Sequence, residues 1–131
     1  MSRREMREQL FKLLFRIEFN AKEEMPQQVA FFFEDENDTD EQDIADINAK
    51  FSSIMDKLDA IDAALNDKVS GWNTERMAKV DLTILRLAVY EIQFDENIPT
   101  GVAINEAVEL AKKFGQESSA SFVNGVLAKF A

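Results

Sequence analysis

The sequence contains no cysteine and no histidine, and these two absences exclude several kinds of chemistry. Without cysteine there is no disulfide bond and no thiol nucleophile, and the usual Cys/His zinc sites are excluded as well. No imidazole is present to activate a serine for nucleophilic attack. The four glycines do not form a phosphate-binding loop. The sequence therefore predicts a protein that is not an enzyme and that binds no metal and no cofactor.

Long apolar runs are also missing. The longest uninterrupted one covers residues 29–33, which is far too short to span a bilayer. Near the N-terminus, Lys12 and Arg16 interrupt the apolar run before it reaches the length of a signal-peptide core. We therefore expect a cytoplasmic protein that does not enter a membrane.

The chain is rich in apolar residues and in acidic residues. It has 131 residues, of which 46% are hydrophobic and 11 are phenylalanine, so one domain with a single core is expected over residues 1–131. The formal net charge of −10 argues against a general nucleic-acid binder. The acidic residues are concentrated in residues 17–67, and the segment 34–43 is expected to be a solvated acidic loop.

The only basic block is the opening segment, which carries Arg3, Arg4 and Arg7. Cations in the first turn of a helix oppose its macrodipole, so they do not help the helix to form. They suit a phosphate backbone, because a guanidinium offers several donors to phosphate oxygens. The alternative interpretation is an ordinary solubilising terminus, partly balanced by Glu5 and Glu8.

Periodicity predicts helices nearly everywhere and an all-α fold of two small helical bundles packed into one domain. The first helix is expected to carry the apolar face from Met6 to Ile17 and to end near Asn20, and the last is expected to carry residues 122–130. The helices between them are expected over about residues 26–33, 44–65, 76–94 and 102–114. Gly71 and Asn73 suggest a division into an N-terminal half of about 1–70 and a C-terminal half of about 71–131. The spacing of Thr39 and Gln42 predicts a capping box before the third helix.

The third predicted helix has an unbroken apolar seam, in which steps of three and four residues alternate. This pattern is typical of an internal seam of a bundle, and the alternative is a coiled coil between two copies of the chain. The seam consists of Ile44, Ile47, Phe51, Ile54, Leu58, Ile61 and Leu65.

Four details of the C-terminal half give further expectations. The fourth helix is apolar nearly all round, which indicates a buried central helix, and on it Arg86 and Tyr90 are expected to be satisfied by hydrogen bonds. Gly115 is expected to cap a helix with a positive φ. Asn124 and Gly125 are typical of a hairpin turn, but no other strand is available. A helix is therefore predicted there, with the glycine marking close packing of another backbone.

Three stretches of the chain resemble the NusB family. The first is the arginine-rich opening at residues 3–15. The second is the sequence Asp81-Leu-Thr-Ile-Leu-Arg-Leu-Ala-Val-Tyr-Glu91. The third and most specific runs from Ile98-Pro99 through Val102-Ala-Ile-Asn-Glu-Ala-Val-Glu-Leu-Ala-Lys112 and Phe114-Gly115 to Phe122-Val-Asn-Gly-Val-Leu127. The similarity spans essentially the whole chain and is weakest over residues 20–70.

This resemblance implies a transcription antitermination factor that binds boxA of nascent ribosomal RNA together with the ribosomal protein NusE, within the transcription elongation complex. By position, it implies an RNA-binding surface at Arg3, Arg4, Arg7, Ser118 and Phe122. It also implies a partner-binding surface at Phe15 and Asp81. Stacking of a splayed base would suit Phe122, although its spacing to Val126 and Phe130 is equally that of a core residue. The alternative function is a helical protein–protein adaptor with little RNA affinity of its own.

Overall fold

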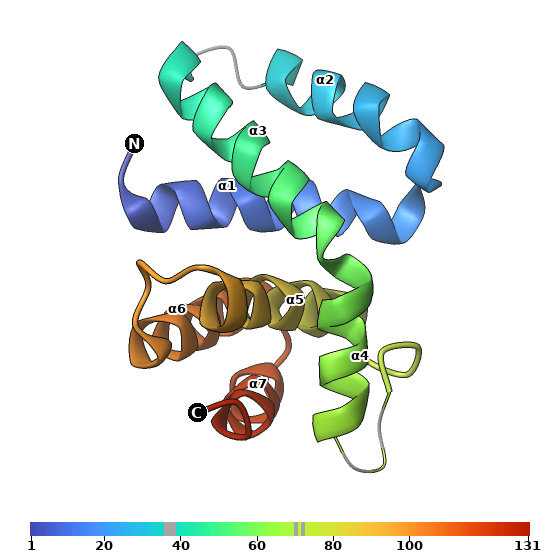
Figure 1. The fold of residues 1–131 in the computed structure, drawn as a ribbon, viewed down its shortest axis with the longest axis vertical. Helices are drawn as coiled ribbons and strands as arrows, with labels where there is room; N and C mark the ends of the chain where they lie inside the picture. The colour runs from blue at the N-terminus through green and yellow to red at the C-terminus, as the bar shows by residue number, and fades with distance from the viewer. Residues whose placement is uncertain (36–38, 70, 72) are drawn as a thin grey trace. The chain divides into compact units, whose positions relative to one another are not determined.

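The computed structural model describes residues 1–35, 39–69, 71 and 73–131 of the chain. Over these residues the structure is helical and contains no strand (Figure 1), which confirms the predicted all-α class. The chain forms two compact units, residues 1–55 and residues 56–131. No helix in the described part of the chain is long and apolar enough to cross a membrane.

Unit 1 contains α1 (Arg3–Phe15), η1 (Arg16–Phe19), η2 (Lys22–Glu24), α2 (Met25–Asp35) and most of α3 (Glu41–Asp56). The first helix is shorter than expected, because it tightens into a 3₁₀ turn where the Asn20 side chain donates to the Arg16 carbonyl oxygen at 2.9 Å. The Arg16 guanidinium also donates to Gln28 at 3.2 Å and lies over the Phe32 ring at 5.3 Å. These contacts hold α2 against the end of α1. The buried core residues of unit 1 are Leu10, Phe11, Leu13, Leu14, Met25, Phe32, Ile47, Phe51 and Ile54.

The start of α3 differs from the expected capping box. The carboxylate of Asp40 accepts a hydrogen bond from the Gln42 backbone N–H at 3.0 Å, so Asp40 and not Thr39 caps the helix. Asp is at least as good an N-cap as Thr, and Asp40 is the residue that directly precedes the first residue of the helix. Nearby, the Met1 ammonium group pairs with Asp43 at 3.2 Å. The middle of the expected acidic loop, residues 36–38, lies outside the described residues.

The predicted single helix over residues 44–65 is wrong, because the chain leaves helical geometry at Lys57 (φ −104°, ψ 3°) before α4 (Leu58–Lys68) begins. The seam continues across this break, and five of its seven members are buried. The internal interpretation of the seam therefore accounts for its apolar character. Because α4 packs against α5, it belongs to unit 2. The division between the units thus falls after Met55, earlier than the expected boundary near residue 70.

Unit 2 is organised around α5 (Lys79–Phe94), which contacts α4, α6 (Thr100–Phe114) and α7 (Ser119–Ala128) (Figure 1). The expectation of a buried central helix is confirmed, since most of α5 is buried. On α6 the buried face consists mostly of small residues. Ile104, Val108 and Phe114 are only half-buried, and the fully buried residues are Ala103, Ala107, Leu110 and Ala111.

The two glycines at the C-terminal end behave differently from expectation. Gly115 has φ −90° and not a positive φ. It is needed because a Cβ there would lie 2.5 Å from the Ser119 Cβ. Residues 124 and 125 are helical, as predicted. The expected close packing at Gly125 is wrong, however, because nothing in the described part of the chain comes within 4 Å of the place a Cβ would occupy.

Candidate nucleic-acid and partner interface

The three N-terminal arginines lie on the first two turns of α1. Ser2 caps this helix, and its hydroxyl oxygen accepts a hydrogen bond from the Glu5 backbone N–H at 3.0 Å. Arg3 and Arg4 are exposed, and Arg7 is half-buried one turn after Arg3. Residues three and four positions apart share one side of a helix, so Arg7 lies on the same side as Arg3 and Arg4. Unit 1 thus presents a cationic helix start.

Two acidic residues, Glu5 and Glu8, lie on the same helix as these arginines. Glu8 pairs with Lys12 at 3.8 Å along the same helix. Glu5 lies in the first turn, where its charge favours the helix dipole. The arginines therefore add positive charge at the end of the helix where a cation is least favourable. This local cost, about 0.3–1 kcal/mol for each exposed cation, is offset when an anion binds there.

Phe15 closes α1 and belongs to a row of aromatic rings. Its centroid lies 6.2 Å from that of Phe11 and 5.0 Å from that of Phe19. Phe11 is buried and Phe15 is half-buried, whereas Phe19 is 66% exposed. The row therefore leads from the core of unit 1 to its surface, and an apolar partner group can pack against it.

Ser118 and Phe122 lie one turn apart at the start of α7 in unit 2. Ser118 is exposed and occupies the N-cap position, and within the described residues its hydroxyl makes no capping hydrogen bond. The neighbouring Ser119 is buried, and its hydroxyl oxygen accepts from the Gln116 backbone N–H at 2.9 Å. Phe122 is half-buried and Val123 is fully buried. The buried face of α7 is thus centred on Val123, and Phe122 lies at its edge.

Asp81 lies in the first turn of α5, which begins after Ala78, a residue without a capping side chain. The carboxylate is buried, and its Oδ1 atom has no hydrogen-bond partner among the described residues. A buried acceptor without a donor costs about 1–3 kcal/mol. The helix dipole offsets part of this cost. Because Oδ1 is buried, a donor from another molecule reaches it only if the side chain turns outward.

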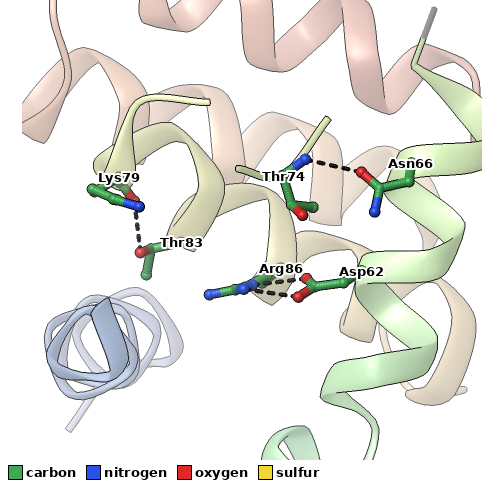
Figure 2. A network of polar contacts seen from close by, with 6 residues as sticks. All are labelled: Asp62, Asn66, Thr74, Lys79, Thr83 and Arg86. Carbon is green, nitrogen blue, oxygen red and sulfur yellow. Dashed lines mark hydrogen bonds and ion pairs between the residues drawn. The ribbon is translucent and has the colours of Figure 1, made fainter. Parts of the chain in front are cut away.

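Unit 2 contains a polar pair that sequence reasoning did not find. Arg86 donates from Nε and Nη2 to the two carboxylate oxygens of Asp62, each at 2.8 Å. Figure 2 shows the two side chains facing each other from α5 and α4, with the Asn66 side chain accepting from the Thr74 backbone N–H nearby. The expectation that Arg86 is satisfied by hydrogen bonds holds, and Asp62 is an acceptor that it did not include. Tyr90 lies 6.0 Å from Phe94, ring centroid to ring centroid.

The sequence-predicted site residues therefore fall into two sets. Arg3, Arg4, Arg7 and Phe15 share α1 in unit 1, and Ser118, Phe122 and Asp81 belong to unit 2. In the described part of the chain no group of three or more acidic side chains is arranged to hold a metal ion.

Comparison with known proteins gives a consistent family assignment. The NusB family matches residues 4–131. The transcription antitermination protein NusB of Lachnoclostridium phytofermentans is 55% identical over 130 residues, which is 98% of each chain. The solved structure of T. maritima NusB superposes with a TM-score of 0.89 at 36% identity, covering 100% of this chain and 91% of that one.

A more distant solved structure contains the antitermination factors NusB and NusE in complex with dsRNA. Its similarity to this chain has a TM-score of 0.84 at 23% identity and covers 98% of this chain and 94% of that one, which establishes the shared fold. The family match and the full-length identity with the curated relative go further than the fold. The chain belongs to the NusB family of transcription antitermination proteins.

Proposed function

We propose that this protein acts in transcription antitermination by binding boxA-type single-stranded RNA together with the ribosomal protein NusE. The observation that carries the RNA part is the cationic start of α1, formed by Arg3, Arg4 and Arg7 in a chain of net charge −10. The related complex of NusB, NusE and RNA supports the choice of partners. This role is that of a non-enzymatic factor in the cytoplasm, within the transcription elongation complex.

The arginines supply affinity more than sequence recognition. Contacts to phosphate oxygens hold a nucleic acid in register but carry no base information. Arginine suits this task because its guanidinium presents several donors in a fixed geometry. Bound phosphate groups would neutralise these cations and so remove their unfavourable interaction with the helix dipole.

Base recognition is assigned to the start of α7. Single-stranded RNA is read by stacking splayed bases on aromatic side chains. Phe122 is half-buried and lies at the edge of the buried face of its helix, which is the position that such a stacking surface would need. The uncapped first turn behind Ser118 adds backbone N–H groups that can meet a phosphate or a base edge.

Replacing Phe122 by alanine should weaken binding of boxA RNA by about 1–3 kcal/mol, because one stacking surface is lost. The dependence of affinity on salt should remain nearly unchanged, since no charge is removed. Fluorescence anisotropy in the presence of NusE, at several salt concentrations, measures both quantities. A large fall in melting temperature with unchanged RNA affinity of the folded protein would make Phe122 a core residue instead.

The partner protein is proposed to contact each unit separately, at Phe15 in unit 1 and at Asp81 in unit 2. Phe15 connects the buried Phe11 to the exposed Phe19, which gives an apolar partner group a place to pack. We propose that the Asp81 carboxylate turns outward to accept a hydrogen bond from the ribosomal protein, which gives the buried Oδ1 atom the donor it lacks among the described residues.

Replacing Asp81 by asparagine keeps the shape of the side chain and removes its charge. We expect NusE binding to weaken by about 1 kcal/mol, because a hydrogen bond to a charged acceptor becomes one to a neutral acceptor, while circular dichroism stays unchanged. Isothermal calorimetry measures the affinity, and Asp95→Asn at the other end of α5 is the matched control. If partner affinity is unchanged and only the melting temperature falls, Asp81 serves the helix dipole alone.

A second candidate function is an adaptor that binds proteins and has little RNA affinity of its own. The net charge of −10, which repels a phosphate backbone, favours it. The two functions differ in whether RNA raises the affinity of the chain for NusE, since coupled binding is reciprocal.

A further inference from the structure

Gly125 occupies an unfavourable place for a glycine. It lies in the interior of α7 and is exposed to solvent. Glycine is among the least favourable residues in a helix interior, because it loses the most backbone freedom on folding. A glycine at such a position is therefore expected to serve a purpose that a side chain would prevent.

The purpose does not lie within the described part of the chain. Apart from the adjoining backbone of its own helix, no atom of those residues lies within 4 Å of where a Cβ of Gly125 would be, and the backbone there does not have a positive φ. At Gly115, by contrast, the fold itself requires a glycine, because a Cβ there would lie 2.6 Å from the Ser119 hydroxyl oxygen. The open surface at Gly125 is thus left for another molecule.

The surroundings of Gly125 indicate the chemistry of that molecule. Phe122 precedes it by three residues and Ser121 by four, and Lys129 follows it by four, so all three adjoin it on the helix surface. Ser121 and Lys129 are exposed and Phe122 is half-buried. Residues 118–131 contain one lysine and no acidic residue, in a chain of net charge −10. This charge pattern favours an anion over a basic protein.

We propose that the sugar–phosphate backbone of bound RNA passes directly over Gly125, where the missing side chain allows it to approach the helix. The base stacked on Phe122 then lies on one side of this point, and Lys129 meets a phosphate on the other. The proposal rests on the proposed function and extends it from the start of α7 along its next two turns.

The test uses Gly125→Ala and Gly125→Leu, with Asn105→Ala on the exposed side of α6 as a control for improved helix propensity. Binding of a boxA-type RNA oligonucleotide is measured with NusE present, and thermal unfolding is measured on the same samples. Both Gly125 variants should melt roughly 2–5 °C higher than the parent, because a helix-favouring residue replaces glycine. RNA affinity should fall about fivefold or more for alanine, and further for leucine, because the added atoms overpack a close contact. The control should gain stability with no loss of RNA affinity.

The outcomes are separable. Unchanged RNA affinity in both Gly125 variants, or a fall in melting temperature, overturns the proposal. A loss of NusE affinity with intact RNA binding assigns the surface to the protein partner and also overturns it. If the parent chain itself does not bind boxA RNA, the proposed function fails before Gly125 is tested.

Discussion

Replacing Arg86 by methionine should lower the free energy of unfolding by about 2–3 kcal/mol, because the Asp62 carboxylate loses its bidentate partner. The arginine donates to both carboxylate oxygens at 2.8 Å, and the two side chains are only 12% and 24% exposed. Water therefore replaces the lost contact poorly. Urea denaturation followed by circular dichroism measures the change.

The pairwise part of this effect is isolated by a double-mutant cycle with Asp62→Leu. We expect the double variant to be more stable than Arg86→Met alone, because no buried charge is then left without a partner. Strictly additive losses would mean that the two side chains contribute independently, contrary to the geometry in Figure 2. RNA affinity of the folded protein should not change in either variant.

Removal of Arg3, Arg4 and Arg7 together should reduce the affinity for boxA RNA by roughly 30- to 100-fold at low salt. Each phosphate contact with a single strand releases about 0.7 counterion equivalents, so the log–log salt dependence should become shallower by about 2. Filter binding at several salt concentrations in the presence of NusE gives both values.

A matched variant separates the position of these charges from their number. Replacing Lys22, Lys68 and Lys112 by alanine makes the same change in net charge at three exposed positions elsewhere. This control should lose little affinity, because its charges lie outside the proposed surface. An equal loss in both triple variants would mean that net charge alone governs RNA binding.

Much of the fold follows from apolar periodicity. The nearly continuous apolar character of α5 predicted its central place, and the spacing along α3 and α4 predicted their buried seam. The break at Lys57 could not be predicted this way, because the seam keeps its spacing on both sides of it. The predictions for the Thr39 cap and for a positive φ at Gly115 were wrong because each sequence pattern allows two structures. Asp40 and Thr39 are both good N-caps, so the sequence does not show which of them caps the helix. A glycine at residue 115 can be required either by a positive φ or by close packing, and here the reason is close packing against Ser119.

The candidate site was accessible from sequence only in part. The arginines at residues 3, 4 and 7 are visible because they form the one basic block in an acidic chain. The pair of Asp62 and Arg86 joins positions 24 residues apart on different helices, and no local pattern connects them. The unpaired Oδ1 of Asp81 and the open surface at Gly125 depend on what surrounds each residue in space. Neither the composition nor the spacing of residues carries that information.

The most direct test of RNA binding with NusE is a titration of boxA RNA, and of a shuffled RNA of equal composition, by this protein with and without NusE. We predict that NusE raises the affinity of this protein for boxA by at least about tenfold. With NusE present, boxA should bind more tightly than the shuffled RNA. The three arginines should contribute about −2 to the salt slope if they contact phosphates. Equal binding of the two RNAs in the presence of NusE would contradict the proposed function.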